Sequence, residues 1–311
     1  MKKISIVVPV YNEEENIQDF YRAVIAAMQH SSYEWEIIFI DDGSQDNTSA
    51  LIHALIEHDS RIKGVFLAHN FGHQIALTCG LDYADGSAVI TMDGDLQHPP
   101  ELIPALLEKW EKGYQIVQTV RLETEDISWF KDWTSHTYYK LFNAISDIKI
   151  KEGGSDFRLL DKSVVLTFRR FRERARFIRG IINSMGYKQT TLEFTAHKRK
   201  AGKSKFTLKK MLAFALAGIT TYSRFPLRLA FYAGTLLGSL SLLGLAHVFW
   251  SRWVEHNTVP GWSTLACSVF LLSGVQLIVL GIVGEYIGRI FEEVKGRPLY
   301  WVKEFAQNKE V

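Results

Sequence analysis

The sequence predicts an α/β fold: a mostly parallel sheet with helices on both faces, followed by an interfacial amphipathic helix and two transmembrane helices. Three observations support this prediction. Short β-branched runs alternate with segments of helical periodicity through about the first 120 residues. Three of these runs end in polar loops. Two uncharged apolar stretches of 22 residues, Leu229–Trp250 and Ser263–Gly284, follow later in the chain, and about 20 residues suffice to span a bilayer.

The composition narrows the class of protein. The chain has 311 residues, a net charge of +2 and 23% charged residues, so nothing global indicates a nucleic-acid partner. Its two cysteines, Cys79 and Cys267, offer neither a disulfide framework nor metal-site spacing. Residues Met1–Tyr11 mimic a short signal peptide, but they lack a small-residue cleavage site and run directly into acidic residues. We therefore expect this stretch to be the first strand of a cytoplasmic domain.

The alternation of strands and helices predicts how the sheet is built. A strand–helix–strand repeat implies parallel strands with right-handed crossovers. The expected strands are Ile4–Val10, Glu36–Ile40, Gly64–Leu67, the run Ala88-Val89-Ile90 and Ile116–Val120, and the expected helices begin at Asn12–Glu15, near Asn47 and at Phe71, the last ending at Tyr83.

The loop after the fourth expected strand is the main candidate site. It places Asp93 and Asp95 one glycine apart, and two prolines then stop the strand. Carboxylates this close repel each other unless a cation lies between them, and Mg²⁺ or Mn²⁺ prefers such oxygen ligands. A lone pair of this kind is more often an exposed acidic turn. Two earlier strands, however, deliver the loops Tyr11-Asn12-Glu13 and Asp41-Asp42 to the same edge, which favours a ligand site.

The middle of the chain is less regular. The aromatic-rich segment 122–150 is either an amphipathic helix packed on the sheet, which the pattern favours, or a wall facing a long apolar substrate. We expect a flexible turn at Gly153–Arg158. The arginines between residues 169 and 179 are expected on a solvated face, with some near anionic headgroups. The basic run His197–Lys205 is a juxtamembrane patch, a glycine-hinged loop that closes over a phosphorylated substrate, or both.

The second half of the chain predicts a membrane anchor. Residues 206–226 have the pattern of a juxtamembrane amphipathic helix, and residues 227–290 that of a two-helix transmembrane hairpin. Arginine and lysine flank the hairpin on its outer sides, whereas its connector holds only one arginine. The positive-inside rule then predicts that both ends of the hairpin lie in the cytoplasm, with the α/β domain at 1–205 and a tail at 291–311.

Three ordered motifs carry a resemblance to a known family. They are Val8–Glu13 (VPVYNE), Asp41–Ser44 (DDGS) and Asp93–Pro100 (DGDLQHPP), and the similarity extends through Arg199–Lys205 and Gly284–Arg289. Together they resemble the family 2 glycosyltransferases, whose GT-A fold is Rossmann-like. More narrowly, the chain is similar to the polyprenyl-phosphate glycosyltransferases, among them dolichyl-phosphate mannose synthases and bactoprenol glucosyltransferases. The two C-terminal spans are most similar to the bactoprenol branch.

The resemblance implies roles for individual residues. Asp95 and Gln97 are implied ligands of Mg²⁺ or Mn²⁺, and Arg121 is the implied contact of the lipid phosphate. Asp156 matches an acidic position near the sugar, although a turn residue that caps its own backbone is almost as good an interpretation. The implied catalytic set is Asp95, Asp156, Arg121, Arg199 and Lys205, the last two as phosphate clamps, and the implied nucleotide-sugar set is Pro9, Tyr11, Glu13, Ile40, Asp41, Asp42, Asp93 and Gly94.

The expected reaction follows from the same resemblance. A hexose, glucose from UDP-glucose in the first instance, would pass with inversion and metal dependence to undecaprenyl or another polyprenyl phosphate. The site is expected at the cytoplasmic face of a bacterial inner membrane, in a homo-oligomer such as a tetramer, and the product would serve cell-envelope glycan modification. The alternatives are another sugar (mannose, amino-arabinose or an N-acetylhexosamine) or a non-catalytic membrane scaffold or flipping subunit. A processive polysaccharide synthase would need more spans and a Gln-x-x-Arg-Trp motif, which this sequence lacks.

Overall fold

The computed structural model describes residues 2–122, 154–195 and 261–308, together with a discontinuous set between 225 and 250. Its residues fall into two compact units. The first contains the described residues up to 195 and those from Arg297 onward, and the second ends at Gly296. The expected aromatic-rich segment at 122–150 and the basic run at 197–205 lie almost wholly outside the described residues, as does the amphipathic helix expected at 206–226.

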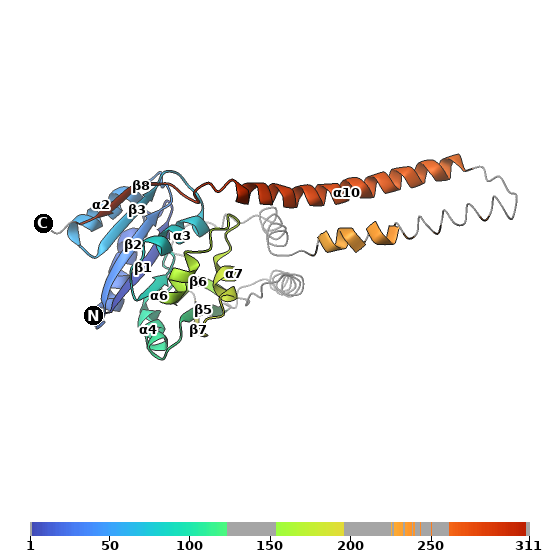
Figure 1. Cartoon of the computed structure of the whole chain (residues 1–311). Helices are drawn as coiled ribbons and strands as arrows, with labels where there is room; N and C mark the ends of the chain where they lie inside the picture. Colours follow the sequence, from blue (N-terminus) through green and yellow to red (C-terminus); the bar gives the residue numbers. More distant parts are fainter. Residues whose placement is uncertain are drawn as a thin grey trace. The chain divides into compact units, whose positions relative to one another are not determined.

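An eight-stranded sheet forms the centre of the first unit (Figure 1), with strand order β7-β5-β6-β4-β1-β2-β3-β8. The four central strands β4, β1, β2 and β3 run parallel, as the sequence predicts. The strands are β1 (Lys3–Val10), β2 (Glu34–Asp41), β3 (Ile62–Leu67), β4 (Ala88–Thr91), β5 (Ile116–Leu122), β6 (Gly154–Asp161), β7 (Gln189–Thr195) and β8 (Val302–Gln307).

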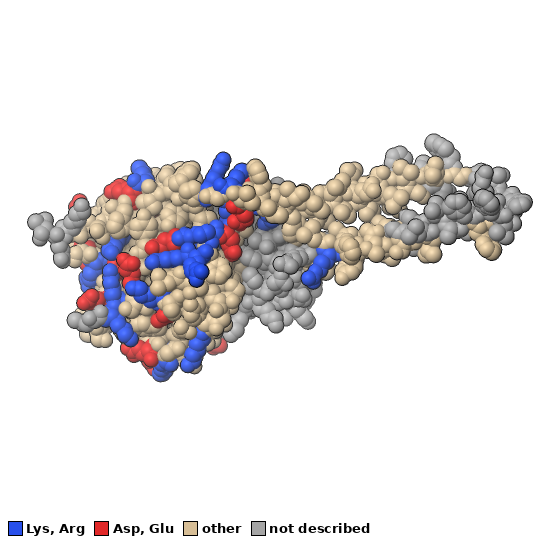
Figure 2. Space-filling model, viewed as in Figure 1, with Lys and Arg blue, Asp and Glu red and all other residues tan. Residues whose placement is uncertain are grey.

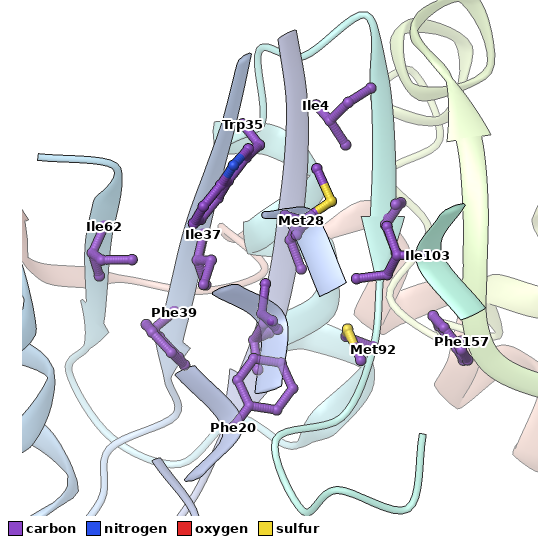
Figure 3. Close-up of a cluster of buried hydrophobic side chains, with 14 of the residues drawn as sticks. Ile4, Phe20, Met28, Trp35, Ile37, Phe39, Ile62, Met92, Ile103 and Phe157 are labelled. Carbon is purple, nitrogen blue, oxygen red and sulfur yellow. The ribbon is translucent and has the colours of Figure 1, made fainter. Parts of the chain in front are cut away.

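Helices cover both faces of the parallel strands, which explains why those strands are continuously apolar. On β1, Ile6 and Val8 face one hydrophobic cluster while Val7 faces the other. Figure 3 shows part of the first cluster, where Phe20 of α1 lies beside Phe39 of β2. The helices of this unit are α1 (Ile17–Met28), α2 (Thr48–His58), α3 (His73–Tyr83), the short 3₁₀ turn η1 (Pro100–Leu102), α4 (Ile103–Glu111), α6 (Lys162–Phe168) and α7 (Ile178–Ser184).

Helix α3 packs unusually closely on the sheet. A Cβ added to Gly80 of α3 would lie 2.1 Å from Cγ1 of Val7 on β1, so no larger residue fits there without displacing the helix. This contact holds the carboxyl-terminal half of α3 directly against β1.

The flank beyond β4 differs from the sequence expectation. The flexible turn expected at Gly153–Arg158 is wrong, because its described part, from Gly154, belongs to β6, which pairs antiparallel with both β4 and β5. Glycines and polar residues ordinarily indicate a turn, but Asp156 and Arg158 neutralise each other inside the sheet. Strand β7 then adds parallel to β5.

The last strand comes from the far end of the chain. Residues 302–307, which lie in the segment expected to be a tail, form β8 and pair antiparallel with β3 (Figure 1). The backbone N–H of Ala68, just past β3, donates to the carbonyl of Trp301 at 2.9 Å. Tyr300 adds a hydrogen bond to Asp82 of α3 at 2.8 Å. The segment 300–307 is therefore an integral part of the first unit.

The second unit contains one long described helix, α10 (Trp262–Val294, 33 residues). Within it, Leu271–Val294 has the length and composition to cross a membrane, with a mean hydropathy of 1.7. Figure 2 shows that the visible face of the first unit carries intermixed acidic and basic side chains, whereas most of α10 carries neither. This helix covers the second expected span and continues beyond Gly284. Among the described residues, one helix is long and apolar enough to cross a membrane, and it is α10. Much of the first expected span, Leu229–Trp250, lies outside the described residues.

Candidate active site at the carboxyl edge of the sheet

The three expected loops meet at one edge of the sheet. Val10 at the end of β1 pairs with Asp41 at the end of β2, and Val7 pairs with Thr91 at the end of β4. The loops that follow the strand ends Val10, Asp41 and Thr91 therefore emerge side by side, where open α/β sheets bind ligands. Of the expected site residues, this edge brings together Tyr11, Glu13, Asp41, Asp42, Asp93, Gly94, Asp95 and Gln97.

The first loop exposes Tyr11 and ties itself to the loop after β2. Asn12 adopts a left-handed backbone with φ of 54°, its N–H donates to Oγ of Ser44, and its Oδ1 accepts from the N–H of Gln45. Pro9 and Ile40, by contrast, lie inside β1 and β2, and the Ile40 side chain is fully buried. Contact of these two residues with a nucleotide stays a prediction.

Asp41 and Asp42 shape the second loop. Oδ1 of Asp41 accepts from the N–H of Ser44 at 2.9 Å, and its Oδ2 accepts from the hydroxyl of Ser49. Asp42 accepts from the N–H groups of Phe71 and Gly72, at 2.7 and 2.8 Å, just before α3 begins. Burial raises the pKa of Asp42 above its ordinary 3.8, while these backbone hydrogen bonds act in the opposite direction.

The third loop presents its acidic residues differently. A Cβ added to Gly94 would meet Cγ1 of Val10 at 2.9 Å, so glycine lets this turn lie directly against β1. Asp95 accepts two hydrogen bonds from Gln97, from the backbone N–H at 3.1 Å and from the side-chain amide at 2.9 Å. The Oδ1 atom of Asp93 is buried and has no hydrogen-bond partner among the described residues.

His98 fixes this loop to β6. Its Nδ1 accepts the backbone N–H of Asp93 at 2.9 Å, and its Nε2 lies 2.7 Å from Oγ of Ser155. A ring nitrogen that accepts carries no proton, so the imidazole is neutral and the 3.6 Å approach of Nδ1 to the Asp93 carboxylate is not an ion pair. The ring also stacks on Phe157. The sequence motif contains His98 but does not indicate this role.

Asp156 is the most heavily paired carboxylate at this edge. It contacts Arg158 of β6 at 2.7 Å and Arg179 of α7 at 2.9 Å, and Arg158 is 1% exposed. Burial alone would raise the pKa of Asp156, but the hydrogen bond to His73 and the charges of both arginines hold it well below 3.8. Asp156 therefore stays ionised at neutral pH and makes a poor general base.

No sequence pattern assigns His73 or these two arginines to the site. Neither arginine stands in a recognisable motif, and His73 follows a glycine with no acidic neighbour in sequence. The alternation of β6 places Arg158 on the same face as Asp156, two residues away, whereas only the fold brings His73 and Arg179 to Asp156. Arg158 is buried enough that the pKa of its guanidinium falls to about 10, which still leaves it charged at neutral pH.

Two groups of expected residues remain apart from this cluster. Arg121 is exposed near the end of β5, where it pairs in register with Phe194, and its role stays a prediction. Arg199 and Lys205 lie outside the described residues.

The donor set of the third loop fits a divalent cation. Carboxylate and amide oxygens are hard ligands, and Asp95 and Gln97 already lie in contact with each other. Within the described residues, no group of three or more His, Cys, Asp and Glu side chains is arranged to hold a metal ion. Asp95 and Gln97 would thus supply only part of the ligand set of a cation held here.

Comparisons with known proteins agree with this architecture. Residues 5–168 match the family model described as glycosyl transferase family 2, and residues 225–290 match one described as the GtrB C-terminal hairpin. The SfII prophage-derived bactoprenol glucosyl transferase of Shigella flexneri is 44% identical over 302 residues, covering 97% of this chain and 98% of that protein. The glycosyltransferase YkcC of Bacillus subtilis is 43% identical over 302 residues, covering 96% and 93%.

A solved structure shares the fold. The mannosyltransferase PcManGT from Pyrobaculum calidifontis, determined in complex with GDP-Man and Mn²⁺, superposes with a TM-score of 0.50 at 16% identity, covering 92% of this chain and 87% of that chain. The family model spans more than half of the chain, and the relatives align over nearly all of it. The protein therefore belongs to glycosyl transferase family 2 and is a glycosyltransferase.

Proposed function

We propose that this enzyme transfers glucose from UDP-glucose to undecaprenyl or another polyprenyl phosphate, with inversion at the sugar carbon and with Mg²⁺ or Mn²⁺. The observation that carries the proposal is the third loop, where Asp93, Asp95 and Gln97 lie at the ligand-binding edge of a family 2 fold. The identity of the substrates is supported by relatives of nearly equal length that are named bactoprenol glucosyl transferases.

The donor is proposed to bind across the three loops. Tyr11 is exposed at the end of β1 and offers its ring to a base, while Gly94 allows the backbone to approach a phosphate. Asp95 and Gln97 would hold the cation, which supplies positive charge to the diphosphate when bound. Asp93, whose Oδ1 lies 3.6 Å from Nε2 of His73, would line the nucleotide site beside them.

The acceptor needs little activation. A lipid monophosphate is already anionic at neutral pH, so its oxygen can attack the sugar carbon directly. The bond between that carbon and the diphosphate oxygen breaks in the same displacement, and UDP leaves with the bonding electrons. Asp156 does not take a proton in this mechanism, because the hydrogen bond to His73 and the charges of the two arginines hold its pKa too low. We assign it the orientation of sugar hydroxyls or the stabilisation of positive charge at the sugar carbon. Arg121, Arg199 and Lys205 are the proposed contacts of the anionic groups.

The enzyme is proposed to act at the cytoplasmic face of a bacterial inner membrane. Helix α10 supplies one segment able to cross the bilayer, and the matched C-terminal hairpin supports a second span before it. Arginine and lysine residues lie before the first span and after the second, which supports a cytoplasmic location for both ends of the hairpin. A homo-oligomer, such as a tetramer, is part of the same proposal.

A transfer assay tests the proposal. Purified full-length protein in detergent is incubated with undecaprenyl phosphate, Mg²⁺ and one radiolabelled sugar nucleotide at a time, with chelator as the control. We expect label from UDP-glucose to enter the organic phase and chelator to abolish it. Label from another donor would correct the sugar. If no donor labels the lipid with Mg²⁺ or Mn²⁺, the reaction is wrong and a non-catalytic role becomes the better hypothesis.

A further inference from the structure

His73 occupies a position between two carboxylates that come from different strands. It is the first residue of α3, and its Nε2 lies 3.6 Å from Oδ1 of Asp93 and 3.5 Å from Oδ2 of Asp156. Asp93 follows β4, whereas Asp156 belongs to β6. The imidazole thus joins the loop proposed to bind the nucleotide to the carboxylate proposed to face the sugar.

The surrounding charges favour a cation at this point. The groups that face His73 are Asp93, Asp156, Arg179 of α7 and Asp42 at the end of β2. Burial opposes protonation of the ring, but the hydrogen bond to Asp156 and the charges of both carboxylates raise the pKa of His73 above its ordinary 6.5. The first turn of a helix disfavours a positive charge. The carboxylates, rather than α3, therefore account for a protonated histidine here.

The two carboxylates depend on His73 to different degrees. Asp156 keeps contacts to Arg158 and Arg179 whether or not the imidazole is present. Oδ1 of Asp93, in contrast, is buried without a hydrogen bond from the described residues, and Nε2 of His73 lies 3.6 Å from it. The charge of Arg158 also acts on Asp93. Loss of the His73 charge would leave Asp93 less compensated and more repulsive to an incoming diphosphate.

We propose that His73 is a positioning residue for the donor: as an imidazolium it bridges Asp93 and Asp156, holds the Asp93 side chain in place and offsets its charge, so that the anionic sugar nucleotide can bind. This inference rests on the proposed donor site, though not on the identity of the acceptor. It assigns the charge of His73 to donor binding, and it leaves the bond-forming step to other groups.

The proposal predicts a particular dependence on pH. The bridge exists only while His73 is protonated, so donor affinity should be highest below the pKa of His73 and fall as pH rises through it. Lysine at this position remains charged over the same range. His73→Lys should therefore weaken or remove the alkaline decline, whereas a neutral residue should lower affinity at acidic and neutral pH.

The experiment measures binding of UDP in the presence of Mg²⁺ to the full-length protein between pH 6 and 9, alongside steady-state kinetics with varied donor. Four variants are compared with the wild type: His73→Asn, His73→Gln as a second neutral replacement, His73→Lys, and His30→Asn as a control at an exposed histidine past α1. At pH 6.5 we expect the neutral variants to bind UDP more weakly and to raise the donor KM, each by about three- to tenfold, with a smaller change in kcat. Thermal unfolding identifies any variant that misfolds.

The outcomes separate this inference from the proposed reaction. Unchanged UDP binding and an unchanged pH profile in both neutral variants would overturn it, as would a lysine variant that behaves like the neutral ones. A mutation that lowers only kcat would also contradict it. If the wild type labels no lipid but its UDP binding still depends on His73 and on pH in the expected way, the acceptor assignment fails while the bridge stands.

Discussion

The two acidic loops after β2 and β4 follow similar strands at the same edge, yet their carboxylates meet different partners. Asp41 and Asp42 are 2% and 3% exposed, and their oxygens accept hydrogen bonds from backbone N–H groups and a serine hydroxyl. The Asp93 side chain is 36% exposed and has one buried oxygen that accepts no hydrogen bond within the described part of the chain. Asp95 is contacted by its loop neighbour Gln97.

The difference lies in the surroundings rather than in the acidic residues. A carboxylate surrounded by N–H groups has satisfied its acceptors and mainly holds loops together. A carboxylate that is contacted by a side-chain amide, as Asp95 is by Gln97, can share a cation with the oxygen of that amide. The loop after β2 is thus mainly architectural, and the loop after β4 is the better candidate for chemistry.

Replacing the most heavily paired carboxylate should have the largest effect on stability. Asp156→Asn removes the negative charge that pairs with two guanidiniums, one of them fully buried, and breaking such a buried pair costs about 3–5 kcal/mol. Because the folded-state pKa lies below 3.8, this stabilisation is present above about pH 3.8 and is lost as pH falls through the folded pKa. Urea unfolding of the wild type and the Asp156→Asn variant, at pH 7 and below pH 3.8, measures this difference in the free energy of unfolding. If the difference between the two proteins does not shrink in acid, Asp156 is not the stabilising carboxylate.

A substitution in the loop after β4 should affect catalysis instead. Asp95→Asn keeps the shape of the side chain but removes the charge proposed to hold the cation. We expect kcat in the lipid-labelling assay to fall by about a hundred- to thousandfold, with little change in the melting temperature. Full activity would remove Asp95 from the metal site, and a large loss of stability would erase the contrast between the two loops.

The matching substitution in the loop after β2 should show the reverse pattern. Asp42→Ala leaves the N–H groups of Phe71 and Gly72 unsatisfied at the start of α3, which costs about 1–3 kcal/mol. We expect a lower unfolding midpoint and a raised donor KM, with kcat reduced less than in the Asp95 variant. A kcat loss equal to that of Asp95→Asn at unchanged stability would assign Asp42 to the chemistry.

Much of the parallel part of the sheet can be predicted from the sequence. Strands such as β1 are buried on both faces and therefore read as mainly apolar runs, and the acidic loops follow at their ends. The spatial order of those loops follows from right-handed crossovers. The amino-acid pattern alone is accordingly enough to indicate which loops form the candidate site.

The rest depends on contacts between distant segments. Strand β6 is polar at Asp156 and Arg158, so no apolar pattern indicates it, and its burial is possible because the charges pair. The capping role of Asp42 requires Phe71 and Gly72, and the bridge of His73 requires residues from two other strands. Strand β8 follows a long apolar helix, and a short segment in that position has the sequence character of a tail.

The position of β8 has a consequence for biosynthesis. The ribosome makes β3 early and β8 only after all of α10, so the sheet lacks its outer strand while the apolar helix is being synthesised. Domains tend to fold during synthesis from their amino-terminal end, but this one finishes its sheet only after that helix has been made. Until β8 has been made, the outer edge of β3 stays available for pairing, so the sheet of the catalytic unit is completed late in the synthesis of the enzyme.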